Sequence, residues 1–430
     1  MRQTSINILK YVIRQLARLT IWRFQPEVIA ITGSVGKTST KEAIFAILAH
    51  CDDFKKKKWR ARKASENFNN ELGAPLTVLG NWKKIGRPLF LFWFRVIISA
   101  LALLILMPSS WYPKILILEY GAAKPGDIKY LLNIAKPKIG VITAVGEIPV
   151  HIEFYENQEA VAREKSKLIE NMFINNFAVL NFDDKAVMSA KEKTRANAIT
   201  FGFNEGADIR ISNFENRSDK NKPLGISFKI EHKENFVPIF LNNVFGAPQA
   251  YVIGAAAVVG LIYGLNLVEI SELVSAHYKP AKGRLNLISG VKNTYIIDDS
   301  YNASPASMKM ALETIKNLEA KRKIAVLGDM LELGKYAIEA HQIIGKLAKE
   351  AVDVLITVGP RGKFIAEAAL AEGMPKNHVL SFDTNEEAGP EVQKIIKKGD
   401  LMLIKASRAM GLEQIVDEIS AAPIVLWPRT

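Results

Sequence analysis

Runs of apolar and β-branched residues alternate with amphipathic stretches along most of the chain. The first run, Val28 to Thr32, ends in a glycine loop, and a helical stretch follows from Lys37 to about Leu48. Further runs typical of buried strands occupy Ile115 to Leu118, Ile139 to Ala144 and Phe177 to Leu180. This alternation predicts an α/β fold with a doubly wound, mostly parallel sheet.

The pattern changes twice after this series. Residues 199–241 read as short strands with polar turns, which predict a small antiparallel annex, and an alanine-rich helix follows from about Pro248 to Leu265. A second, Rossmann-like α/β series then begins, so we expect one domain over 26–282 and another over 283–430. Strands of the second series are expected at Thr294 to Asp298, Lys323 to Leu327, Val354 to Val358, His378 to Phe382 and Leu401 to Lys405.

Residues 1–25 have helical periodicity and carry basic residues but no acidic one. A basic amphipathic helix either docks on the core of its own protein or lies on an acidic membrane surface, and both interpretations stay open. The expected apolar face consists of Leu9, Val12, Ile13, Leu16 and Leu19.

The most apolar segment is Leu89 to Met107, inside an insert of about residues 86–113. Its length is just sufficient to span a bilayer. A single crossing would separate the glycine loop from Glu119, which we expect at the same site. We therefore favour a hairpin or helix that enters the membrane surface, or an apolar cap buried by protein, over a transmembrane anchor.

The composition narrows the class of protein. The chain of 430 residues has a formal net charge of +13 and one cysteine, Cys51, which excludes a disulfide framework and indicates a reducing, cytoplasmic setting. No cleavable signal peptide is evident. The basic run from Lys55 to Lys63 is compatible with a solvated basic face, with anionic lipid or with a diphosphate substrate. Without an accompanying nucleic-acid module it does not indicate a nucleic-acid partner.

A glycine loop between the first strand and helix has the spacing of a phosphate-binding loop. Its glycines turn backbone N–H groups toward phosphates, Lys37 supplies positive charge, and the Thr38 hydroxyl suits Mg²⁺. The residues expected to contact the nucleotide here are Gly33, Ser34, Val35, Gly36, Lys37, Thr38 and Ser39.

Three more side chains are candidates in the first domain. Glu119 and His151 follow strands whose carboxyl ends meet at one edge of a parallel sheet, where ligands bind. Lys165 lies within the apolar stripe of a helix from about Gln158 to Met172, so it points inward. An inward lysine is either functional or extends its amine back to water, and the pattern alone leaves both open.

Polar residues also end three strands of the second domain. They include Asp299 and Asn302 after one strand, Asp329 after another, and Lys405 at the end of a third. Each alone is explained by turn formation, but three such loops at one edge suggest a ligand-binding face.

Five stretches together resemble the Mur ligase family, and within it the member that acts on D-alanyl-D-alanine. They run from about residue 28 to the C-terminus. The stretches are Thr32 to Glu42, Asn67 to Thr77, Glu119 to Ala122, Asp298 to Pro305 and Val326 to Gly334.

The resemblance implies roles for the candidates. Lys37 and Thr38 would serve ATP and Mg²⁺, Glu119 and His151 would be metal ligands, and Lys165 would be a carbamylated lysine with catalytic and metal-binding roles. The resemblance also implies that Asn69 and Asn70 lie near the acyl substrate. It implies that four residues of the second domain close over the nucleotide: Arg284, Asp299, Asn302 and Lys405.

The implied reaction is ATP-dependent joining of D-alanyl-D-alanine to a UDP-N-acetylmuramoyl-tripeptide through an acyl phosphate, in peptidoglycan synthesis, by a monomer. Only about 25 residues precede the first strand, where the family carries a domain that recognises the UDP sugar, and Pro248 and Gln249 replace a usual His and Asn. A related ligase with another acyl acceptor therefore stays open, as does a non-catalytic ATP-binding regulatory protein.

Overall fold

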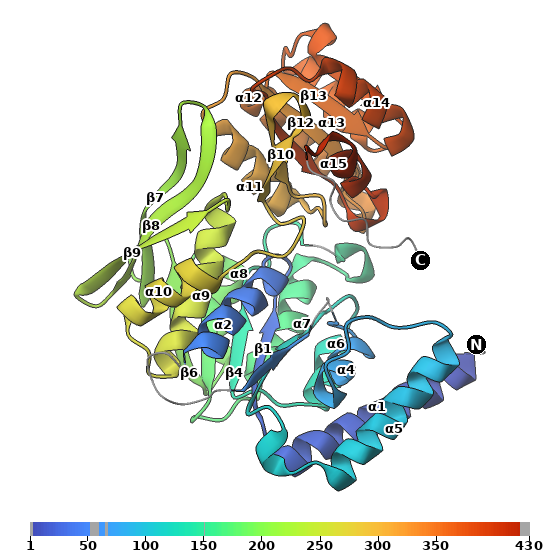
Figure 1. Cartoon of the computed structure of the whole chain (residues 1–430), viewed down its shortest axis with the longest axis vertical. Helices are drawn as coiled ribbons and strands as arrows, with labels where there is room; N and C mark the ends of the chain where they lie inside the picture. The colour runs from blue at the N-terminus through green and yellow to red at the C-terminus, as the bar shows by residue number, and fades with distance from the viewer. Residues whose placement is uncertain (1–2, 52–59, 65–67, 150, 422–430) are drawn as a thin grey trace.

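The computed structural model describes residues 3–51, 60–64, 68–149 and 151–421. The chain folds into two α/β units, each built on its own sheet (Figure 1). This arrangement confirms the predicted α/β class. The first sheet ends before helix α10 (Leu267–His277) and the second begins at β10 (Asn286–Gly290), so the expected boundary near residue 282 falls in the connection between them.

The first sheet has nine strands in the order β2-β3-β1-β4-β5-β6-β7-β8-β9. Its strands from β2 to β7 pair in parallel, while β7, β8 and β9 pair in antiparallel fashion. The predicted antiparallel strands are therefore confirmed, and they extend the main sheet of the first domain through the pairing of β6 with β7. The strands are β1 (Glu27–Thr32), β2 (Ala61–Lys63), β3 (Ile115–Glu119), β4 (Ile139–Ile142), β5 (Phe177–Asn181), β6 (Asn197–Gly202), β7 (Ile209–Asp219), β8 (Lys222–His232) and β9 (Asn235–Asn242).

Helices cover both faces of this sheet because successive strand residues point to opposite sides. Ile29 and Ile31 of β1 pack in a cluster with α2 (Lys37–His50), α9 (Ala247–Ile262) and α10. Val28 and Ala30 of the same strand pack in a second cluster on the other face. That face is covered by α4 (Gly73–Leu79), α6 (Asp127–Leu132) and α7 (Gln158–Glu170), with the short α8 (Lys185–Met188) nearby.

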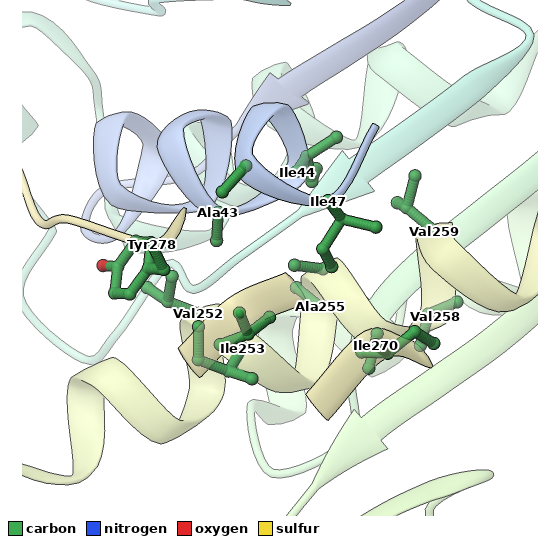
Figure 2. Close-up of a cluster of buried hydrophobic side chains, with 14 of the residues drawn as sticks. Ala43, Ile44, Ile47, Val252, Ile253, Ala255, Val258, Val259, Ile270 and Tyr278 are labelled. Carbon is green, nitrogen blue, oxygen red and sulfur yellow. The ribbon is translucent and has the colours of Figure 1, made fainter. Parts of the chain in front are cut away.

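Helices α2 and α9 lie against each other over the phosphate-loop side of the sheet (Figure 2). Ala43 and Ile47 of α2 lie toward Val252 and Ala255 of α9 in a buried layer. The small alanines of α9 allow close approach of the two helices. The helix that begins at the phosphate loop is therefore anchored along its length.

The N-terminal helix and the apolar insert form a pair of helices beside the first domain (Figure 1). The helix α1 (Gln3–Phe24) buries Ile13, Leu16 and Ala17, but Leu19 is exposed, which corrects the expected apolar face. The insert is one continuous helix, α5 (Leu89–Leu106), rather than a hairpin. Only 22% of α5 is buried, so it is not an apolar cap enclosed by protein.

The second sheet has six strands in the order β10-β11-β15-β12-β13-β14. All pairs are parallel except β10 with β11, and helices cover both faces. Strands β11, β15 and β12 are neighbours, so the three polar loops predicted from the sequence do meet at one edge. The remaining elements are β11 (Thr294–Asp298), β12 (Lys323–Gly328), β13 (Val354–Val358), β14 (Val379–Phe382), β15 (Leu401–Lys405), α11 (Pro305–Lys316), α12 (Ala337–Ala351), α13 (Gly362–Ala371), α14 (Asn385–Ile395) and α15 (Glu413–Ile419).

Candidate active site

The phosphate loop connects β1 to α2 and depends on two glycines. Gly33 and Gly36 have φ of +144° and +88°, in the region that favours glycine. A Cβ on Gly33 would lie 2.0 Å from the Thr143 hydroxyl oxygen. The loop therefore packs closely on the end of β4 and presents the N-terminus of α2, where backbone N–H groups attract anions.

Lys37 folds back over this loop, and its ammonium donates to the Gly33 carbonyl at 2.6 Å. Desolvation lowers the pKa of Lys37 to about 8, an effect that Glu119 opposes and Arg284 reinforces. A desolvated cation is poised for a phosphate, whose negative charge would hold the lysine protonated.

Glu119 ends β3 and is fully buried beside the phosphate loop. One of its oxygens lies 3.3 Å from the Thr38 hydroxyl, and the other lies 2.9 Å from the ammonium of Lys41. Lys41, one turn beyond Lys37 on α2, was not predicted as a site residue. A carboxylate adjacent to a hydroxyl fits the oxygen ligands that Mg²⁺ prefers.

His151 faces the second domain. It has φ of 68° and its Nδ1 pairs with the carboxylate of Glu332, which lies after β12. The hydrogen bond from His151 lowers the pKa of Glu332. Within the described part of the chain no three His, Cys, Asp or Glu side chains gather as a ready-made metal cluster. His151 borders the same pocket as Thr38, but here it joins the two domains.

Lys165 lies on α7 between Val161 and Leu168, as the apolar stripe predicts, and it is 2% exposed. Burial, reinforced by the charge of Lys37, lowers the pKa of Lys165 to about 7. A substantial fraction of the amine is then neutral near pH 7. Neutral amines, unlike ammonium ions, react with carbon dioxide to give carbamates.

Two pockets meet at the phosphate loop. The first has a volume of about 530 Å³ and extends past Asn181 and Tyr251. The second, of about 680 Å³, contains Lys37, Thr38 and Lys165. Four residues line both pockets and so mark where their contents would meet: Ser34, Gly36, Arg284 and Asn302.

The second domain contributes a buried polar group to the first pocket. Lys405 pairs with Asp299 at 2.6 Å and donates to the Asn302 carbonyl at 2.8 Å. Burial raises the pKa of Asp299 and lowers that of Lys405, against the attraction between them. The guanidinium of Arg284 lies over the Tyr301 ring, 4.2 Å from its centroid. The structure thus brings these predicted residues to one pocket.

The far end of the first pocket contains Tyr251 and Asp183, which were not predicted as site residues, and Gln249, which stands where the family usually has Asn. Tyr251 of α9 donates to Asp183 at 2.7 Å, just after β5. Gln249 is buried, donates to the Arg284 carbonyl at 3.0 Å and accepts from Tyr278. The residue in place of the family's usual Asn therefore connects the two domains.

Asn69 and Asn70 both border the second pocket. The carbonyl of Asn69 accepts from the Gly121 N–H, and the side chain of Asn70 accepts from the Gly73 N–H at the start of α4. These bonds fix the loop against the end of β3. Asn67, part of the same matching stretch, lies outside the described residues.

Two protein-family models and several known ligases match this chain. The model of the Mur ligase middle domain matches residues 101–258, and that of the Mur ligase, glutamate ligase domain, matches residues 283–408. A Bacillus subtilis protein named UDP-N-acetylmuramoyl-tripeptide--D-alanyl-D-alanine ligase is 31% identical over 417 residues, which cover 96% of this chain and 80% of that protein. The chain belongs to the Mur ligase family.

Other Mur ligases are similarly related. A Mycobacterium leprae protein with the same name is 29% identical over 91% of this chain and 72% of its own. The structure resembles MurF from Thermotoga maritima in complex with ADP, with a TM-score of 0.75, 26% identity, and coverage of 95% of this chain and 83% of that one. A structure of MurF from Acinetobacter baumannii also has a TM-score of 0.75, with 25% identity, and covers 95% of this chain and 80% of that one. This Mur ligase is therefore an ATP-dependent enzyme that forms amide bonds.

Proposed function

We propose that this Mur ligase adds D-alanyl-D-alanine to UDP-N-acetylmuramoyl-tripeptide in the synthesis of peptidoglycan precursors. The observation that carries the proposal is the meeting of two pockets at one phosphate loop. A nucleotide in the first pocket and an acyl group in the second would be neighbours at Ser34 and Gly36. The names of the related ligases supply the substrates.

The reaction begins when the substrate carboxylate attacks the γ-phosphorus of ATP, which forms an acyl phosphate and releases ADP. The amine of D-alanyl-D-alanine then attacks the acyl carbon, phosphate leaves, and the amine loses a proton. Lys37 stabilises the charge on the transferring group, while Asn69 and Asn70 position the acyl chain.

Thr38 and Glu119 are the residues that would hold Mg²⁺, which when bound neutralises charge on the phosphates. Lys165 as a carbamate would present an anion to the same pocket, and His151 would join the ligands by exchanging its contact with Glu332. From the second domain Arg284, Asp299, Asn302 and Lys405 hold the nucleotide and exclude water.

We place the enzyme in the cytoplasm as a monomer, at the inner face of the membrane, where its products would be used. We propose as its partners the small substrates and, through peripheral contact, the inner face of the membrane, with no nucleic acid.

The test is an assay of phosphate release with ATP, Mg²⁺ and UDP-N-acetylmuramoyl-tripeptide, with and without D-alanyl-D-alanine, with the product followed by mass. We expect phosphate and UDP-pentapeptide in equal amounts, and neither in the Lys37→Gln variant. A folded, ATP-binding preparation that releases no phosphate with this tripeptide would refute the substrate assignment, and other acyl acceptors would then be screened.

A further inference from the structure

Helices α1 and α5 lie side by side beside the first domain, and each exposes a row of apolar side chains to solvent; together these form the α1–α5 face. This α1–α5 face consists of Ile8, Tyr11, Leu19 and Trp22 of α1 together with Phe90, Phe94, Ile98 and Ile105 of α5. On α5 these residues are separated by four, four and seven positions, which places them along one side of the helix. Single exposed apolar side chains are ordinary, but an exposed side of this length indicates an interaction surface.

The geometry of α5 excludes a crossing of the bilayer. Its opposite side is buried, at Trp93, Val96 and Ala100, against the body of the first domain. The chain enters α5 from α4 and leaves it for β3, and both of these elements pack in the same domain. Both ends of α5 must therefore lie on one side of a membrane, with the helix along its surface.

The two chain segments that contain the face carry only basic charged residues. Residues 1–26 and 72–118 contain no Asp or Glu, whereas each segment carries five Lys or Arg residues. Lys83, Lys84 and Arg87 are exposed just before α5, and Arg18 and Arg23 are exposed on α1. Such a surface repels a second copy of itself and complements an anionic one. Trp22 and Trp111 are exposed near the C-terminal ends of the two helices and suit the headgroup region.

We propose that the α1–α5 face docks on the surface of a bilayer that contains anionic phospholipid, with both helix axes in the plane of the headgroups. The apolar side chains enter the acyl boundary and the basic residues contact phosphates. This proposal specifies how the enzyme would be held at the membrane named under its proposed function, and it rests on that function only for the choice of membrane. Lipid binding is measured without substrates, so the two proposals can fail separately. Lys10 of α1 pairs with Glu71 and borders the second pocket, so docking places the acyl-substrate pocket beside the lipid.

The test is co-sedimentation of the full chain with vesicles of phosphatidylcholine alone or with added phosphatidylglycerol. We expect binding to the anionic vesicles at least about tenfold tighter than to the neutral ones, and weaker binding at high salt. Phe94→Glu combined with Ile105→Glu should weaken binding by about tenfold or more. Lys83→Ala with Lys84→Ala and Arg87→Ala should reduce both the affinity and its dependence on salt.

A matched control adds the same charges elsewhere. Phe236 of β9 is 62% exposed, close to the 64% of Phe94, and lies at the edge of the sheet far from β3; Ile338 is an exposed isoleucine of the second domain. Phe236→Glu with Ile338→Glu should bind vesicles like the parent chain, and all variants should keep their affinity for an ATP analogue. The proposal would be overturned if both glutamate variants lost vesicle binding equally, or if the parent chain bound neutral and anionic vesicles equally. It would also be overturned if the parent chain were a dimer and only the Phe94→Glu, Ile105→Glu variant were a monomer.

Discussion

Three buried lysines at the site differ in what surrounds them. Lys41 pairs with Glu119 and Lys405 pairs with Asp299, so each cation has an adjacent carboxylate. At Lys165, burial and the neighbouring charge of Lys37 lower the pKa to about 7. This lowered pKa leaves a substantial part of the Lys165 amine neutral near pH 7, which fits its proposed conversion to a carbamate.

Replacement of this lysine gives the first prediction. Lys165→Ala should lower kcat by about 100-fold or more, because the pocket loses the anion that a carbamate supplies. Acetate or formate should restore part of the activity of this variant by filling the vacated space with a carboxylate. Phosphate release measures both effects, and ¹³C-bicarbonate should give a carbamate NMR signal in the parent chain that the variant lacks.

Lys167→Ala is the control for that prediction. Lys167 lies on the same helix, is partly exposed and pairs with Glu164. Its loss should leave kcat within about twofold, because the Lys167 side chain is partly exposed and borders neither pocket. If the two alanine variants lose equal activity, or if carboxylates rescue neither of them, Lys165 is a packing residue only.

The site residues show what spacing along a sequence reveals. The phosphate loop was predicted in full because its residues are adjacent in the chain and its geometry follows from glycine. The contact of His151 with Glu332 and that of Tyr251 with Asp183 were not predicted. Their partners are far apart in sequence, and only the folded sheet order brings them together.

At the scale of elements, the anchoring of α2 decides how rigidly the phosphate loop is held. Val258 of α9 is fully buried in the cluster that packs on α2. Val258→Ala removes two methyl groups and leaves a cavity, so it should destabilise the first domain by about 2 kcal/mol.

Urea unfolding followed by tryptophan fluorescence measures this change. The control is Val268→Ala on α10, where the same side chain is 58% exposed and its loss should cost about 0.5 kcal/mol or less. A similar midpoint shift in both variants would mean that the α9 cluster does not limit the stability of the first domain.

Element prediction succeeded where burial imposes a pattern. The strands at Thr294 to Asp298, Val354 to Val358 and Leu401 to Lys405 match the structure at both ends, because each is apolar and flanked by polar turns. The attachment of β7 to β6 was not predicted, since alternation shows which side of a strand is buried but not its neighbour. Likewise, the apolar run from Leu89 to Met107 predicted the length of α5, but it did not predict which side of the helix faces solvent.

At the scale of the whole molecule, each pocket is lined by both domains, so neither domain alone forms the site. Arg284 stands at the start of the second domain, borders both pockets, and receives through its carbonyl a hydrogen bond from Gln249 of the first domain. Its side chain is therefore placed to contact the nucleotide and the acyl substrate together.

Removal of the Arg284 side chain should lower kcat/KM for both substrates. Arg284→Ala keeps the backbone bond to Gln249 but deletes the charge, and we expect kcat/KM for ATP and for the acyl substrate each to fall by about 10- to 100-fold, as for other charge-assisted contacts. Lys282→Ala, two residues earlier, removes an exposed cation that pairs with Asp417 outside both pockets, and it should change neither value by more than about twofold. Steady-state kinetics with each substrate varied in turn separates the cases. A loss confined to ATP would assign Arg284 to the nucleotide alone, whereas equal effects of the two variants would mean that the net charge near the boundary, rather than the position of Arg284 between the pockets, supports binding.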